Sequence, residues 1–174
     1  GLAGLRGDWS SDVCSSDLTG LVNGDQFGYY VDDVGDMNSD GITDVAVGAW
    51  QADSAGVQSG QAFVFSGVDG TEIHRFSTQA GDVLGCSVGG AGDVDGDGVP
   101  DVIVGASGAD DNGPYSGAAY VYSGATGALI HSFAGRSEGD QFGNCVSGAG
   151  DVDGDGTPDL LVGAINDEIG RAHV

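Results

Sequence analysis

The chain has 174 residues, enough for the core of one domain, and its 35 glycines with 40% hydrophobic residues exclude a collagen-like or a disordered chain. Its 27 acidic residues outnumber four basic ones, and the net charge of −23 makes nucleic acids and anionic membranes poor partners because it repels phosphate. No apolar run is long enough to predict a membrane span. So much acid with so little base needs compensation in the folded state, and bound cations are the obvious candidate.

The two ends of the chain read as antisense copies of each other. One codon set for residues 168–174 has a reverse complement that encodes residues 12–18 without a mismatch. Because two ends of one natural gene have no reason to be related in this way, we interpret residues 1–18 and 168–174 as adapter-derived sequence. We therefore expect residues 19–167 to hold the fold, as a fragment of a longer protein. This interpretation sets aside three suggestive features, which are the tripeptide Arg6-Gly7-Asp8, Cys14 and His173.

A segment of about 57 residues occurs three times between these ends. Each copy starts with a Gly-Asp-x-Phe/Leu-Gly motif, continues into an acidic nine-residue loop and then into an apolar stretch that ends in Val-Gly-Ala. The motifs span residues 24–28, 81–85 and 139–143, the loops 36–44, 93–101 and 151–159, and the apolar stretches 45–49, 102–106 and 160–164. We accordingly predict one domain with repeats at about 24–80, 81–137 and 138–167.

Short β-branched and aromatic stretches separated by glycine indicate strands. In chain order, the first repeat predicts strands at about 27–34, 44–49, 60–65 and 72–76, and the second at about 84–91, 101–106, 117–122 and 128–133. The third repeat stops after its first two strands. Four antiparallel strands in a repeat of this length form the blade of a propeller. The predicted fold is therefore all-β, a partial β-propeller of about three four-stranded antiparallel blades, the third incomplete.

A solenoid is the alternative architecture for a repeated sequence. Solenoid repeats usually run about 20 to 47 residues and often contain a helix, whereas this sequence has no helical periodicity. Glycines in the first strand of the second and third repeats favour the propeller, because neighbouring backbones converge at its central axis and leave no room for side chains. These glycines are Gly89, Gly90, Gly92, Gly148 and Gly150.

The acidic loops are candidate metal sites. Each carries a side-chain oxygen ligand at positions 1, 3, 5 and 9, glycine at position 6 and a backbone carbonyl at position 7, which together make a cage for a hard cation. The expected ligands are Asp36, Asn38, Asp40, Ile42 and Asp44; Asp93, Asp95, Asp97, Val99 and Asp101; and Asp151, Asp153, Asp155, Thr157 and Asp159. An all-oxygen set favours calcium over zinc or copper, and Mg²⁺ would keep its waters. We expect up to three Ca²⁺ sites.

Two other interpretations of these loops are weaker. The loops could be ordinary solvated turns, because Asp-Gly is common in turns. That interpretation would leave several carboxylates repelling one another without a cation, at the same positions in all three repeats. An EF-hand needs a bidentate Glu at position 12 and a helix beyond it, whereas position 12 here is Val47, Val104 or Val162 inside an apolar strand. Asn38 leaves the first loop with three carboxylates against four in the others, so we expect that loop to bind most weakly.

The ordered motif resembles a known repeat. Phe27-Gly28, the acidic loop and Val47-Gly48-Ala49 are together similar to the FG-GAP repeat of the integrin α-subunit propeller and its bacterial relatives. The resemblance implies a seven-bladed propeller, extracellular or at the cell surface, with calcium loops between the first two strands of some blades and away from the ligand-binding face. The departures from the motif are Leu84 in place of its Phe, and Trp50, Ser107 and Ile165 in place of its final Pro.

Nothing in the sequence predicts an enzyme. His74 and His131 fall at equivalent places in different repeats, which separates them and excludes a catalytic pair. Cys86 and Cys145 are not at equivalent positions; they could approach across neighbouring blades, but we expect free buried thiols. The sequence has neither a nucleophile elbow nor a phosphate-binding loop. The closely spaced aspartates all lie in the acidic loops, where calcium accounts for them.

We therefore predict a calcium-binding, non-catalytic propeller module for extracellular adhesion, or for recognition of a protein or glycan at a cell surface, of the bacterial type. One alternative is an accessory propeller domain of a secreted hydrolase or lyase whose catalytic part lies outside this sequence. Another is a structural repeat of a cell wall or outer membrane. Besides an external ligand, the expected partners are the missing blades of the same chain.

Overall fold

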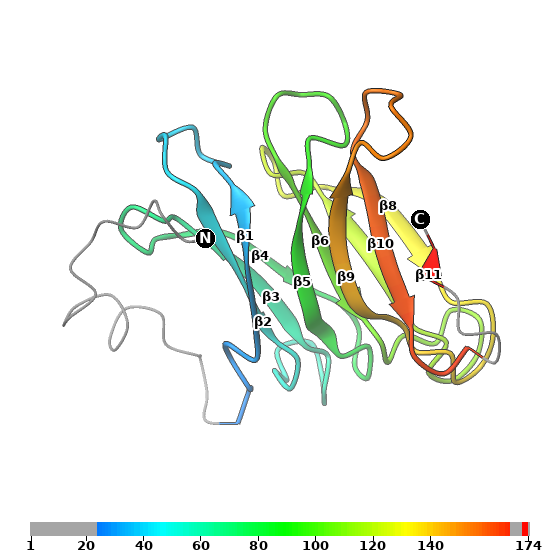
Figure 1. Ribbon diagram of the computed structural model, residues 1–174. Helices are drawn as coiled ribbons and strands as arrows, with labels where there is room; N and C mark the ends of the chain where they lie inside the picture. The colour runs from blue at the N-terminus through cyan, green and yellow to red at the C-terminus, as the bar shows by residue number, and fades with distance from the viewer. Residues whose placement is uncertain (1–23, 168–171, 174) are drawn as a thin grey trace.

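The computed structural model describes residues 24–167 and 172–173, which form three antiparallel β-sheets (Figure 1). The first sheet has the order β1 (Tyr30–Gly35), β2 (Asp44–Ala49), β3 (Gln61–Phe65) and β4 (Glu72–Ser77). The second has the order β5 (Leu84–Gly92), β6 (Asp101–Ala106), β7 (Ala118–Tyr122) and β8 (Leu129–Ala134). The third has the order β11 (Ala172–His173), β10 (Asp159–Ala164) and β9 (Phe142–Gly150).

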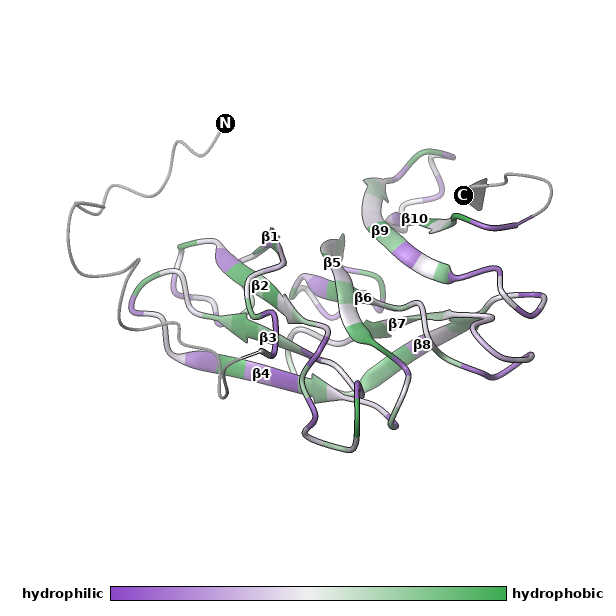
Figure 2. Cartoon of the chain, turned by 90° about the horizontal axis from the view of Figure 1, so that it is seen from below, coloured by the Kyte–Doolittle hydropathy of each residue, from purple (hydrophilic) through white to green (hydrophobic). Residues whose placement is uncertain are grey.

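The sheets fan out from their first strands. β1, β5 and β9 lie side by side, while β4 and β8 lie at the outer edge (Figure 2). Consecutive antiparallel sheets arranged in this way are blades of a propeller, and the predicted all-β, partial propeller fold is confirmed. No described stretch of the chain forms a helix long and apolar enough to cross a membrane.

The sequence pattern locates the strands closely, with one addition in the third sheet. β1 starts at Tyr30 rather than at residue 27, and β5 runs to Gly92. The addition is β11, in which Ala172 and His173 pair with Gly163 and Val162 of β10. These two residues belong to the segment assigned to adapter-derived sequence, whose other residues lie outside the described chain, as do residues 1–18. Backbone groups at the open edge of β10 pair with this extended segment because an unpaired strand edge is a template for any nearby strand.

Two hydrophobic clusters lie between neighbouring sheets, and a third, around Val47 and Phe63, lies within the first blade. One cluster joins Val64 and Phe76 of the first sheet to Leu84 and Val104 of the second. A second cluster joins residues such as Ile103 of the second sheet to β9 and β10 of the third. The central strands β2 and β6 are buried almost throughout, which explains their continuous apolar sequence. Because the second sheet buries both of its faces against its neighbours, much of the core is shared between blades.

Two glycines of the repeated motif meet across each of these interfaces. A side chain on Gly48, in the Val-Gly-Ala stretch of the first blade, would overlap the carbonyl oxygen of Gly85 in the second. Gly105 and Gly143 are related in the same way between the second and third blades. A side chain on Gly85 or Gly143 would in turn overlap the carbonyl oxygen of Gln61 or Ala118 in the preceding blade, so both members of each pair need to be glycine.

The first strands also approach closely at the axis. A side chain on Gly90 would lie 3.0 Å from the carbonyl oxygen of Asp33, and one on Gly148 would overlap the carbonyl oxygen of Gly90. The expectation of glycine at a crowded axis therefore holds for Gly90 and Gly148, whereas a side chain on Gly150 would meet no described atom within 4 Å. In β1, the residues equivalent to Gly89 and Gly90 are Asp32 and Asp33, and burial raises the pKa of Asp32.

Candidate metal sites in three acidic loops

The three acidic loops connect the first two strands of each sheet and stand at the same end of the fan, at the top of Figure 1. Neighbouring loops are in contact. A side chain on Gly35, next to the first loop, would lie 2.8 Å from Pro100 Cγ of the second loop, and Gly92 faces Pro158 of the third in the same way. The loops therefore form a continuous row along the interfaces between blades.

Each loop is folded by its own side chains. The carboxylate at position 1 accepts the N–H of the position 6 glycine, at 2.8 Å for Gly41, 2.9 Å for Gly98 and 3.0 Å for Gly156. The oxygen at position 3 accepts the position 5 N–H, and the carboxylate at position 5 accepts the position 7 N–H, in all three loops. Because these bonds span only two to five residues, the spacing of polar residues and glycines within the loop determines most of its internal hydrogen bonding.

Two positions of each loop adopt left-handed backbone. The position 6 glycines have φ between 87° and 95°, as the turn expected there requires. Position 4 is also left-handed, a requirement that sequence reasoning missed. Gly96 and Gly154 occupy it in the second and third loops, whereas the first loop has Ser39 at φ 62°. A non-glycine residue in this conformation is strained, so the first loop is the least favourably built of the three.

The second loop brings three carboxylates together. Asp93, Asp95 and Asp101 each offer an oxygen within 4.8 Å of the others. Asp93 Oδ2 accepts the Gly98 N–H, while its Oδ1 is buried and has no hydrogen-bond partner among the described residues. A buried carboxylate oxygen without a donor is costly unless a cation satisfies it. The residues of this loop therefore fit the cation that the sequence predicts.

The third loop brings together a different set of carboxylates. Asp151, Asp153 and Asp155 meet the same 4.8 Å condition and are all exposed. Asp159 lies apart from this set and accepts the Val152 N–H at 2.8 Å. In the first loop, three carboxylate oxygens do not converge in this way within the described chain, because Asn38 takes the place of an aspartate.

The position 9 aspartates have a structural role that sequence reasoning missed. Asp44 is fully buried and accepts N–H groups from Met37 at 2.8 Å and from Gly67 at 3.1 Å. Asp101 is equally buried and accepts from Val94 at 2.7 Å and from Gly124 at 3.0 Å. Each therefore ties its loop to the turn between the third and fourth strands. Burial raises the pKa of Asp101.

Within residues 24–167, the histidines and cysteines form no catalytic arrangement. His74 Nε2 lies 2.6 Å from the carbonyl oxygen of Gly124 in the next blade, whereas the equivalent His131 is exposed. Cys86 and Cys145 are both free thiols. Burial raises the pKa of Cys86, as expected for an inert thiol. The expectation of burial is wrong for Cys145, because no described sheet covers that side of β9.

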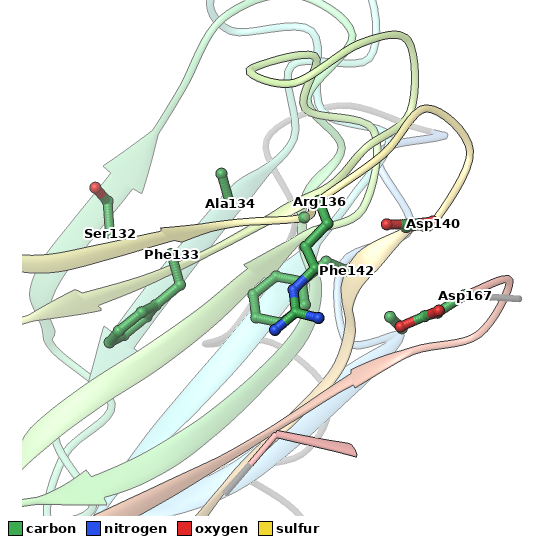
Figure 3. Close-up of a pocket in the computed structure, with 9 residues that line it drawn as sticks. Ser132, Phe133, Ala134, Arg136, Asp140, Phe142 and Asp167 are labelled. Carbon is green, nitrogen blue, oxygen red and sulfur yellow. The ribbon is translucent and has the colours of Figure 1, made fainter. Parts of the chain in front are cut away.

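A cavity of about 450 Å³ lies where β8 meets the third sheet (Figure 3). Phe133, Arg136, Asp140 and Asp167 are among its lining residues. At the equivalent place between the first two blades, Phe76 stacks on Tyr122 of β7 with ring centroids 4.1 Å apart. The described third sheet has no strand equivalent to β7, so the cavity occupies the place of a packed aromatic side chain. The described lining contains no nucleophile with an adjacent base.

Comparison with known proteins identifies the repeat. The sequence profile of the FG-GAP repeat matches residues 87–122 and 146–174. The chain is 32% identical to integrin alpha-4 of Xenopus laevis over 142 residues, or 74% of this chain and 13% of that protein. It is 32% identical to integrin alpha-6 of Gallus gallus over 155 residues, 82% of this chain and 14% of that protein. Integrin alpha-3 of Cricetulus griseus is 31% identical over 171 residues, 86% of this chain and 15% of that protein. The chain thus spans a small part of the length of these relatives.

Proposed function

Because this chain is an FG-GAP repeat protein similar to integrin α subunits, we propose that it is a calcium-binding, non-catalytic recognition module that acts at the cell surface or outside the cell. The observation that carries the proposal is the row of three acidic loops at one end of the blades. In the second loop, a buried carboxylate oxygen of Asp93 has no donor among the described residues, which supports a bound cation.

The ligands of these sites are oxygen atoms from five positions in each loop. The side chains at positions 1, 3, 5 and 9 and the position 7 carbonyl hold the cation. In the first loop these are Asp36, Asn38, Asp40, Ile42 and Asp44. The second loop uses Asp93, Asp95, Asp97, Val99 and Asp101, and the third uses Asp151, Asp153, Asp155, Thr157 and Asp159. Position 9 can serve both the backbone and the cation, because each carboxylate oxygen has two lone pairs. Oxygen ligands on a flexible loop suit Ca²⁺ better than Mg²⁺.

Calcium acts in this proposal as a structural ion. It neutralises the repulsion within loops that carry three or four carboxylates in a chain of net charge −23. It also stabilises the folded state, because the cages exist only when the loop is folded. The partner is a protein or glycan ligand, bound on the face opposite the loops. The blades present the β2–β3 and β6–β7 connections on that face.

Titration of the chain with Ca²⁺ tests the metal sites. We expect isothermal titration calorimetry to give up to three sites, with the first loop weakest because it has fewer carboxylates. Asp97→Ala and Asp155→Ala should each remove one site and leave the others, since both side chains are exposed and each cage is local. Asp111→Ala is the matched control, because this exposed aspartate lies outside the loops. A folded wild-type chain that titrates no Ca²⁺ would sink the assignment.

A further inference from the structure

Ser66 is a buried side chain beside the first acidic loop. It lies in the turn between β3 and β4 and is 6% exposed. Its Oγ accepts a hydrogen bond from Asn38 Nδ2 at 3.3 Å and donates to Asp40 Oδ2 at 3.3 Å. The Val68 N–H donates to the same oxygen at 3.2 Å, which fixes the hydroxyl within its own turn. Ser66 therefore touches the side chains at positions 3 and 5 of the loop.

The second blade has a serine at the same place without these contacts. Ser123 is also buried, and its Oγ accepts the Thr126 N–H at 3.2 Å. Its hydroxyl has no hydrogen bond to Asp95 or Asp97 in the described structure. The difference between the blades follows position 3 of the loop, which is Asn38 in the first blade and Asp95 in the second.

An asparagine at position 3 has an orientation requirement that an aspartate lacks. Its side chain ends in one oxygen and one NH₂ group, and only the oxygen can accept a backbone N–H or bind a cation. Asn38 Oδ1 accepts the Asp40 N–H at 2.9 Å, the bond that Asp95 Oδ1 makes to Asp97 in the second loop. The amide therefore presents its oxygen as an aspartate would, with Nδ2 turned toward Ser66.

We propose that Ser66 is a positioning residue of the first loop, whose hydroxyl holds the Asn38 amide with its oxygen toward the cation site. The inference rests on the proposed calcium-binding function. It explains how an asparagine at position 3 can present an oxygen ligand, because a side chain outside the loop orients its amide. The second and third loops need no such residue, because the two oxygens of a carboxylate are equivalent.

Ser66→Ala tests this role through the affinity of each loop for Ca²⁺. The amide N–H signals of Gly41, Gly98 and Gly156 report the three loops separately in ¹H–¹⁵N spectra of the whole chain during titration. We expect the first loop to lose roughly three- to tenfold in affinity, the effect of one hydrogen bond, with the other loops unchanged. Ser123→Ala is the matched control and should leave the second loop at wild-type affinity. An equal loss in the control would overturn the proposal.

A double-mutant cycle with Asn38→Asp separates orientation from packing. An aspartate has no amide to orient, so Ser66→Ala should cost clearly less affinity in that background, where only the bond from the Ser66 hydroxyl to Asp40 is lost. Any loss of packing is common to both backgrounds and cancels. An equal loss in both backgrounds would show that Ser66 acts only through packing or through Asp40, and would contradict the inference. Absence of Ca²⁺ binding at all three wild-type loops would instead refute the proposed function itself.

Discussion

Ser39 is the one non-glycine residue at position 4 of the acidic loops, and its φ of 62° places it in the left-handed region. We expect Ser39→Gly to stabilise the chain by up to about 1 kcal/mol, because relief of strain exceeds the added entropy of the unfolded glycine. Gly96→Ser, the reverse change in the second loop, should destabilise by a similar amount. Urea unfolding midpoints in the absence of Ca²⁺ measure both. Destabilisation by Ser39→Gly would show that the serine side chain contributes more than its strain costs.

At the scale of residues, the sequence predicted the structural features that depend on residues close together in the chain. The loops were recognisable because their hydrogen bonds join residues two to five positions apart, so the spacing of aspartates and glycines contains the structure. The bond from Gly124 N–H to Asp101 and the contact of Ser66 with Asn38 join residues more than 20 positions apart. Such contacts depend on how the turn between the third and fourth strands meets the loop, which no local pattern encodes.

At the scale of elements, the glycine contacts between blades are the most demanding feature. We expect Gly105→Ala to destabilise the chain by about 1–3 kcal/mol, since the new methyl would overlap the Gly143 carbonyl and force the blades apart. Gly163→Ala is the matched control in the third blade, where the nearest atoms to a Cβ are 3.6 Å away. Chemical denaturation compares the two variants. Equal effects would mean that strand propensity, rather than the interface, governs the response.

The strands themselves were predictable because glycines separate the apolar stretches within each repeat, and the same pattern occurs in all three repeats. β11 was not predictable. Its pairing with β10 depends on an open sheet edge, a property of the assembled fold rather than of the sequence at residues 172–173.

At the scale of the whole molecule, the two end sheets expose side chains whose repeat equivalents are buried. Val31 of the first sheet is 59% exposed, whereas Val88 at the same place in the second is 3% exposed. Val152 of the third loop is 63% exposed, whereas the equivalent Met37 is 4% exposed. Both ends of the fan therefore expose positions that are buried between blades elsewhere in the described chain. The number of blades in a closed ring stays a prediction from the resemblance, because local contacts specify neighbours and not their count.

We expect the purified chain to be marginally stable and to associate through these faces, because open apolar surfaces and strand edges drive assembly. Ca²⁺ should raise its melting temperature by binding only the folded state. Sedimentation velocity at several protein concentrations in millimolar Ca²⁺ measures the association. Val31→Glu should reduce it, since the charge disrupts one of the two faces. A sharp monomer with a cooperative melt would mean that the blades are self-sufficient.

The glycine pairs between blades also bear on how such a chain can change in length over generations. The second copy of the motif faces two neighbours: the glycine that ends its Gly-Asp-x-Leu-Gly segment, Gly85, meets the preceding blade, and the glycine of its Val-Gly-Ala stretch, Gly105, meets the following one. A tandem duplication of one whole repeat would therefore create two new junctions that are already matched. A substitution at one glycine would disrupt a contact between blades, and the compensating substitution would have to occur in another repeat. Gain or loss of entire blades is thus an easier evolutionary step than alteration of the joints between them.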